Sequence, residues 1–278
     1  MPSPKLALVI RDCLCQSYGV ELVDHPDAPY SYIPGIDAYS AGVIAHPGFE
    51  LIHITLRRPE AWQSGIEEAI AAVEALDLPI NALCAFELRC PTPHSFEGFG
   101  AFNDEYRTVL GDAGLLLKRT NPIARTNVAP VVDPPEFTQL YGFTFVSPMD
   151  DEVDEWDDDI EPSFVVAGAG DLVDQADLRP EAIVGSGQED SKKIRSEKMA
   201  QVIGVMEERM ATLGVGWDDV TIANVYTAGA LGTHLAGDIL APMGQHAAHG
   251  VHWHYSHPPI SGLTFEMDVR GIGSEQWV

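Results

Sequence analysis

The stretch Asp150–Glu161, which reads Asp-Asp-Glu-Val-Asp-Glu-Trp-Asp-Asp-Asp-Ile-Glu, divides the sequence into two comparable halves. Pro148 and Pro162 flank it. Like charges at this density repel, and a proline on each side disfavours continuation of a helix or strand. A calcium loop would need spaced oxygen ligands and a glycine turn, which the stretch does not offer. We therefore expect residues 150–162 to form an acidic linker between two modules.

The upstream half predicts elements in the order β-β-α-β-α-β-β. Apolar alternation bounded by turn residues predicts strands over residues 39–45, 49–56, 82–90, 123–132 and 137–146. Apolar residues at helical spacing predict one helix from Trp62 to Leu76 and a second from Phe99 to Leu110, with Ser95 as its cap. These elements make up a first module over residues 38–149.

The downstream half repeats this order over residues 163–278. Its predicted strands cover residues 164–169, 182–186, 220–226, 250–255 and 263–269. Its helices follow apolar stripes from Met199 to Leu213, behind a cap at Asp190, and from Leu231 to Ile239. Residues 1–37 have no counterpart in this half, so they form an N-terminal extension.

Charge limits the kinds of partner. The 278 residues include 42 acidic and 16 basic side chains, for a net charge of −26. Such a surface repels phosphate backbones and anionic headgroups, so we expect neither nucleic acid nor a membrane as partner. The charge can also serve solubility or salt adaptation alone. Since no apolar run approaches about 18 residues and the N-terminus lacks a signal-peptide pattern, we expect a soluble, cytoplasmic protein.

Cysteine spacing gives no disulfide framework. The four cysteines stand at positions 13, 15, 84 and 90. Cys84 and Cys90 fall on one predicted strand, about 20 Å apart in extended geometry, which is too far for a disulfide. We expect reduced thiols.

Short motifs recur in matching order in the two halves. The first half has Tyr39-Ser40-Ala41, Phe102-Asn103-Asp104-Glu105-Tyr106 and Ala124-Arg125-Thr126-Asn127-Val128; the second has Val184-Gly185-Ser186-Gly187-Gln188 and residues 217–226 and 263–269. Through these motifs, residues 38–146 and 163–270 resemble the RidA/YjgF family of imine and enamine deaminases. The resemblance implies an α+β fold of two tandem RidA-like (chorismate-mutase-like) modules, each a six-stranded mixed sheet with two helices on one face. It also implies pockets between modules and a homo-oligomer with three-fold packing, a trimer or a multiple of one.

Arg125 is the first candidate site residue. It lies in a predicted strand among mostly uncharged neighbours, and its planar guanidinium matches a carboxylate bidentately. The resemblance implies that this arginine holds the substrate's carboxylate. Asn127 projects to the same strand face, where its amide could contact a carboxylate or carbonyl, or cap a local backbone group.

Glu266 and Asp268 are the candidate catalytic acids. They alternate with apolar residues in the last predicted strand, which puts both on the face opposite the core. The resemblance implies that an acid at Asp268 orients the attacking water. A solvated sheet face is the alternative in so acidic a chain.

Each half carries only part of the arginine and acid pair that the resemblance implies. The first has Arg125 but Gly142 and Thr144 where the acids would fall, and the second has the acids but His249 at the position of the arginine. Either the two halves form one composite site, or one site has decayed into scaffold. Thr55 and Ser186 occupy corresponding positions in the two halves and are further candidates for substrate contact.

A histidine cluster closes the second half: His246, His249, His252, His254 and His257. In a strand, His252 and His254 share a face and could chelate a metal. Trp253 and Tyr255 alternate with them, which also fits a polar, substrate-facing strand. We predict no metal site here.

The residues and the resemblance together predict a cofactor-independent deaminase, with no metal or nucleotide required. Its substrate would be an enamine or imine carboxylate of the 2-aminomuconate or 2-amino-5-chloromuconate type, a small anionic unsaturated amino acid from aromatic amine or nitroaromatic breakdown. The products would be a keto or enol acid and ammonia. Two alternatives stay open: a non-catalytic small-molecule-binding protein, and a ring-opening amidohydrolase of the cyanuric acid or barbiturate type.

Overall fold

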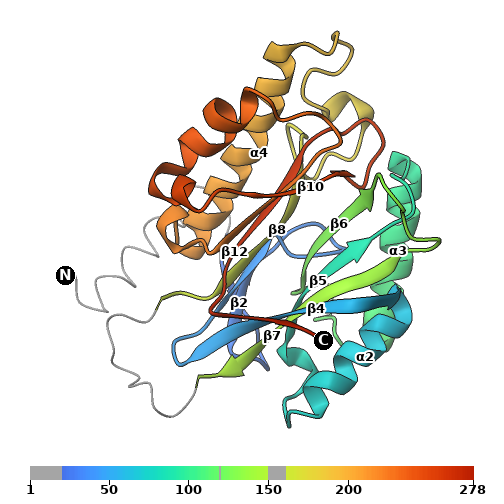
Figure 1. The fold of residues 1–278 in the computed structure, drawn as a ribbon. Helices are drawn as coiled ribbons and strands as arrows, with labels where there is room; N and C mark the ends of the chain where they lie inside the picture. Colours follow the sequence, from blue (N-terminus) through green and yellow to red (C-terminus); the bar gives the residue numbers. More distant parts are fainter. Residues whose placement is uncertain (1–20, 119, 150–160) are drawn as a thin grey trace.

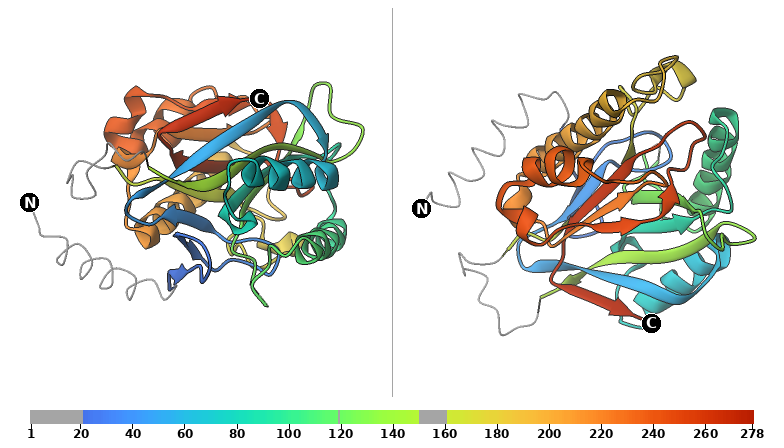
Figure 2. Two further views of the ribbon diagram at one scale, coloured as in Figure 1. Left: turned by 90° about the horizontal axis from the view of Figure 1, so that it is seen from below. Right: turned by 45° about the horizontal axis from the view of Figure 1, so that its top comes forward.

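The computed structural model describes residues 21–118, 120–149 and 161–278 (Figure 1). Most of the predicted linker, residues 150–162, and the first part of the predicted extension, residues 1–37, lie outside the described residues. The fold is mixed α+β, with two mixed sheets of six and seven strands. The helices lie on the outer sides of the two sheets (Figures 1 and 2).

The six-stranded sheet consists mainly of strands from the first half. Its order is β11 (Ser256–His257), β6 (Ala124–Pro130), β5 (Leu83–Arg89), β7 (Gln139–Pro148), β4 (Phe49–Ala61) and β13 (Ser274–Trp277). Two amphipathic helices, α2 (Trp62–Glu74) and α3 (Phe96–Asp112), bury their apolar stripes against it. The predicted cap is confirmed, because the Ser95 hydroxyl accepts a hydrogen bond from the Gly98 N–H at 3.0 Å.

The seven-stranded sheet combines both halves. Its order is β1 (Val23–Asp24), β2 (Tyr30–Ile33), β3 (Gly42–Ala45), β8 (Phe164–Gly170), β12 (Glu266–Gly271), β9 (Ile222–Tyr226) and β10 (His252–His254). Helix α4 (Lys192–Leu213) packs its Met and Val stripe on this sheet. Its cap is Ser191 rather than the predicted Asp190, whose carboxylate instead pairs with Arg195.

The two halves share one strand order. In the first half it is β4-β7-β5-β6, and in the second it is β8-β12-β9-β10. In each set the first two pairings are antiparallel and the last is parallel. Four strands of each half therefore share one order and one pattern of strand directions.

Several strands cross from one half to the other, which the sequence did not predict. Strand β3, expected beside β4, pairs with β8 of the second half, and the C-terminal β13 runs parallel to β4 (Figure 2). Strand β11 likewise pairs with β6. The two halves are thus interlocked by backbone hydrogen bonds.

Two predicted elements take other forms. Residues 182–186 were expected to be a strand, but they form a turn after the short 3-10 helix η2 (Pro180–Ala182), and Gly185 has φ 72°, outside the extended region. The predicted helix from Leu231 to Ile239 becomes a π-helical turn, η4 (Leu235–Leu240), followed by the irregular η5 (Ala241–Ala248). Pro242 lacks an N–H donor in this region, so a regular α-helix cannot continue through it.

The alternation in β12 sorts its side chains between the two sheet faces. Phe265, just before the strand, and Met267 and Val269 pack on the α4 side, whereas the acids alternate onto the opposite face. That face was expected to lie away from the core. It is buried against the six-stranded sheet, where Arg270 of β12 pairs with Glu87 of β5.

His53 on β4 belongs to this buried polar layer between the sheets. Its Nε2 lies 3.6 Å from Glu87 Oε1, and its Nδ1 lies 2.9 Å from the Thr144 hydroxyl. Burial, with a further contribution from Arg270, lowers the pKa of His53 to about 4. The folded state therefore holds this imidazole neutral at neutral pH.

The free energy of unfolding should fall as the pH drops from about 6.5 toward 4. Because the pKa of His53 is lower in the folded chain than in the unfolded chain, its stabilising contribution is present above pH 6.5 and lost toward pH 4. The loss is on the order of 3 kcal/mol. Urea unfolding at several pH values should show a shallower decline for His53→Gln, with the exposed His252→Gln as control. Identical pH dependence in H53Q and the wild type would contradict this.

Candidate active site

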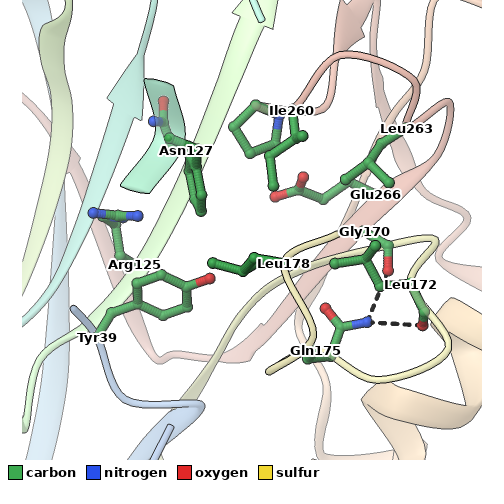
Figure 3. A pocket seen from close by; sticks show the side chains of 13 residues that line it. Tyr39, Arg125, Asn127, Gly170, Leu172, Gln175, Leu178, Ile260, Leu263 and Glu266 are labelled. Atoms are coloured by element: carbon green, nitrogen blue, oxygen red, sulfur yellow. Dashed lines mark hydrogen bonds between the residues drawn. The ribbon is translucent and has the colours of Figure 1, made fainter. Parts of the chain in front are cut away.

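A small pocket lies where β6, β8 and β12 meet helix α3. Figure 3 shows Arg125, Asn127 and Tyr39 on one side and Glu266 on the other. Its volume is about 30 Å³, enough for about two water molecules. The lining residues are Tyr39, Phe99, Arg125, Asn127, Gly168, Gly170, Leu172, Gln175, Leu178, Pro259, Ile260, Leu263 and Glu266. The pocket therefore brings together Arg125 and Asn127 of the first half and Glu266 of the second.

Arg125 is a buried cation without a counter-charge in the described part of the chain. Its side chain is 3% exposed, and Nη2 donates to Asn103 Oδ1 at 2.7 Å, while Nη1 is buried without a hydrogen-bond partner. Four aromatic rings lie with their centroids 4.5–5.5 Å from its guanidinium carbon: Tyr39, Phe99, Phe102 and Tyr106. Burial lowers the pKa of Arg125. An anion entering the pocket would supply the charge and the acceptor that the guanidinium lacks.

Asn127 adds further unused hydrogen-bonding capacity. Both its amide nitrogen and its amide oxygen are buried and lack a partner among the described residues. A buried polar atom left unpaired costs about 1–3 kcal/mol, so such atoms are rare without a functional reason. Together with Arg125 Nη1, the Asn127 amide marks one wall of the pocket as a binding surface for a polar ligand.

Glu266 forms the opposite wall of the pocket. The residue is 3% exposed, and its carboxyl group makes no hydrogen bond within the described residues. Burial raises the pKa of Glu266 well above its usual range, and Asp268 and Asp171 raise it further, against the opposing effect of Arg125. A raised pKa favours the protonated form of the acid, which can donate its proton to a substrate.

Gly168 makes room for this carboxyl group. A Cβ atom at Gly168 would lie 2.4 Å from Glu266 Oε1 and 3.1 Å from the Thr126 methyl group. The Gly168 N–H also donates a hydrogen bond to the Thr126 hydroxyl oxygen, at 3.1 Å, which ties the two sheets together beside the pocket. The missing side chain at position 168 is therefore a condition for the observed position of Glu266.

Comparison with known proteins identifies the family of this chain. The sequence profile of the family described as 2-aminomuconate deaminase CnbZ matches residues 22–276. The chain belongs to this family. The 2-amino-5-chloromuconate deaminase of Comamonas testosteroni is 39% identical over 250 residues, covering 88% of this chain and 94% of the relative. Among solved structures, a chorismatase is similar with a TM-score of 0.40 and 11% identity, over 91% of this chain and 85% of the other.

In this CnbZ-family chain, Asp268 lies outside the pocket. Its carboxylate accepts hydrogen bonds from Asn224 Nδ2 and the Tyr226 hydroxyl, each at 2.8 Å. Burial raises the pKa of Asp268, and the nearby Glu87 raises it further. Of the two acids on one strand face, Glu266 is therefore the one available to a ligand in the pocket.

The other sequence candidates are not among the pocket's lining residues. Thr55 is buried on β4 and lies 3.3 Å from His53 Nε2. Ser186 is exposed in the turn after η2, and His249 is exposed at the end of η5, where its ring packs on His246. The geometry thus supports no direct contact of Thr55, Ser186 or His249 with a ligand in this pocket.

The histidine cluster is dispersed in this family member. His254 Nε2 lies 3.0 Å from Asn224 Oδ1, and its ring stacks on Tyr226. Among the residues the structure describes, no three His, Cys, Asp or Glu side chains are grouped as metal ligands. Cys84 and Cys90 are both buried and free, as predicted. No helix in the described ranges has the length and apolar character to span a membrane.

Three of the pocket residues that sequence reasoning missed bear on its chemistry. Tyr39 was quoted as part of a motif without a role, yet its ring lies 4.5 Å from the Arg125 guanidinium. Gly168 has no side chain to suggest a role, yet the space that this leaves accommodates Glu266. Gln175 could not have been found, because nothing in the pattern indicates that its loop folds over the pocket through hydrogen bonds to backbone oxygens of Gly170 and Leu172 (Figure 3).

Proposed function

We propose that this protein deaminates an enamine carboxylate of the 2-aminomuconate type, without a cofactor, to give a 2-oxo acid and ammonia. One observation carries the proposal: Arg125, buried with its Nη1 unpaired among the described residues, faces the buried Glu266 across a single pocket. Burial raises the pKa of Glu266, which favours its protonated form. The pair supplies an anchor for a carboxylate and a proton for the adjacent enamine. Membership of the 2-aminomuconate deaminase family supports this choice of substrate.

The first chemical step is proton transfer to carbon. Arg125 and Asn127 bind the carboxylate next to the amino-bearing C2 and fix its orientation. Glu266 gives its proton to a carbon of the conjugated enamine. The enamine thereby becomes an iminium ion with an electrophilic C2, and Glu266 becomes a carboxylate stabilised by nearby cations.

The second step adds water to C2. The Glu266 carboxylate takes a proton from the water as its oxygen bonds to C2, and this gives a carbinolamine. Proton transfer to nitrogen and collapse of the carbinolamine break the C–N bond and release ammonia. In sum, one enamine and one water give one 2-oxo acid and one ammonia, and Glu266 regains its proton.

We also propose that the two halves are RidA-like modules. The shared strand order β4-β7-β5-β6 and β8-β12-β9-β10 supports a common origin of the halves. In this interpretation, the arginine of one module and the acid of the other form the composite site, which accounts for the incomplete residue set of each half.

Ammonia release tests the function directly. The wild-type protein should release ammonia from freshly generated 2-aminomuconate, or from its 5-chloro form, well above the spontaneous rate. Release no faster than buffer with both substrates would refute the proposal. Tight retention of substrate without turnover would support the non-catalytic binder, and activity only on cyclic imides would support the amidohydrolase.

Gly168→Ala should lower kcat roughly 10- to 100-fold, because the new Cβ displaces the Glu266 carboxyl group from its position. KM should change less, since Arg125 keeps its surroundings. Steady-state ammonia release measures both constants. Gly204→Ala on α4, where a Cβ meets no atom within 4 Å, is the matched control. A G168A enzyme with the wild-type kcat would show that the position of Glu266 is unimportant.

A further inference from the structure

The pocket is small for a whole six-carbon diacid, because its volume of about 30 Å³ holds about two waters. A second cleft of about 560 Å³ adjoins it, because Tyr39 and Gln175 line both. A substrate anchored at Arg125 therefore has space for its remote end toward this cleft.

The cleft contains one cation among the described residues that line it, Arg209 of α4. Arg209 Nη1 donates to the backbone oxygen of Ala167 on β8 at 2.8 Å, next to Gly168. This bond fixes the guanidinium beside the pocket, and its other N–H donors have no hydrogen-bond partner among the residues that the structure describes. No carboxylate lies within ion-pair distance of Arg209 in the described part of the chain.

The surroundings of Arg209 leave room for an anion. Its electrostatic partners are Tyr39, Glu208 and Glu266. Burial raises the pKa of Glu266, which favours its uncharged form, and Glu208 is exposed, so solvent screens its charge. Asp174, also on the cleft wall, is exposed in the same way. Arg209 is therefore half-buried with no carboxylate in ion-pair contact among the described residues.

We propose that Arg209 binds the second, remote carboxylate of a dicarboxylic enamine and so selects diacids over monoacids. The inference rests on the proposed function and adds a specificity residue to it. Arg125 would bind the carboxylate beside the reacting carbon, and Arg209 the one at the other end of the chain. Tyr39, shared by both cavities, would pack against the conjugated carbons between them.

Two stable six-carbon dienes separate the roles of the arginines: muconate, with two carboxylates, and sorbate, with one. Calorimetric titration should show that the wild type binds muconate about 10- to 100-fold more tightly than sorbate. Arg209→Gln should remove this preference and leave sorbate affinity unchanged. Arg209→Lys, which keeps the charge without the fork, should retain part of it. Arg195→Gln, an exposed arginine on the same helix, is the matched control.

Three results would overturn the inference. The first is a wild type that binds muconate no more tightly than sorbate, and the second is an R209Q variant that keeps the preference for muconate. The third is an equal loss of affinity for muconate and sorbate in both R209Q and R209K. That equal loss would assign Arg209 a structural role through Ala167. Ammonia release by the wild type from 2-aminomuconate is measured alongside. Its absence would refute the proposed function, whereas turnover combined with an intact preference in R209Q would refute only the role of Arg209.

Discussion

Replacing Arg125 with methionine should lower kcat/KM by about 30- to 5,000-fold while changing the stability of the fold little. The activity falls because the substrate carboxylate loses its charged partner, a loss of about 2–5 kcal/mol for a buried pair. Two effects on stability oppose each other: the substitution removes a buried cation with an unpaired Nη1, but it also removes the hydrogen bond to Asn103 Oδ1.

Steady-state ammonia release measures the loss of activity, and urea unfolding measures the change in stability. Arg125→Lys should recover only part of the activity, because an ammonium cannot reproduce the planar fork. Arg107→Gln, in an exposed pair with Asp37, is the control for loss of an arginine. Wild-type kcat/KM in R125M would contradict the anchor, and severe destabilisation would indicate a structural role for the guanidinium.

Replacing Glu266 with glutamine should lower kcat about 10²- to 10⁴-fold with little change in KM. The amide keeps the shape of the side chain but cannot protonate the enamine or activate water. The wild-type rate should decline as the pH rises through the raised pKa of Glu266, because the first step needs the protonated acid. This decline should be absent from the residual activity of E266Q.

Stability gives an independent measure of the same acid. Because the pKa of Glu266 is higher in the folded than in the unfolded chain, its contribution to stability is complete below about pH 4 and is lost as the pH rises toward the folded pKa. E266Q should therefore be more stable than the wild type in mildly alkaline solution. The Asp268→Asn variant distinguishes the two acids. It should weaken the hydrogen bonds to Asn224 and Tyr226, and its kcat should fall less than that of E266Q. The reverse order of kcat losses would assign the acid role to Asp268.

Local pattern predicted the elements that carry the site. The strand with Arg125 and Asn127 and the alternation around Glu266 follow from residue type and period-two spacing. The same periodicity cannot tell which of Glu266 and Asp268 is the better candidate for the catalytic acid, since both lie on one face of the strand. Their difference comes from the neighbouring strands, because β9 supplies Asn224 and Tyr226 to Asp268 and β8 supplies Gly168 to Glu266.

The local sequence pattern could not predict which strands pair with each other. The strand 42–45 was predicted as an element, but its partner β8 is chosen by tertiary packing. The failed strand at residues 182–186 has a local cause, because apolar Ile183 and Val184 suggested extension while Gly185 and Gly187 adopt left-handed backbone conformations. The composite site, raised as one of two hypotheses, depends on how the sheets pack, and only the structure brings Arg125 and Glu266 into one pocket.

A crystal structure of the complex with muconate is the decisive experiment, since this stable diacid resembles the proposed substrate but lacks the amino group. We expect one carboxylate on Arg125 and Asn127, with the conjugated carbons facing Glu266 between the two sheets. A diacid bound elsewhere, with Arg125 Nη1 and the Asn127 amide still unpaired, would contradict this expectation.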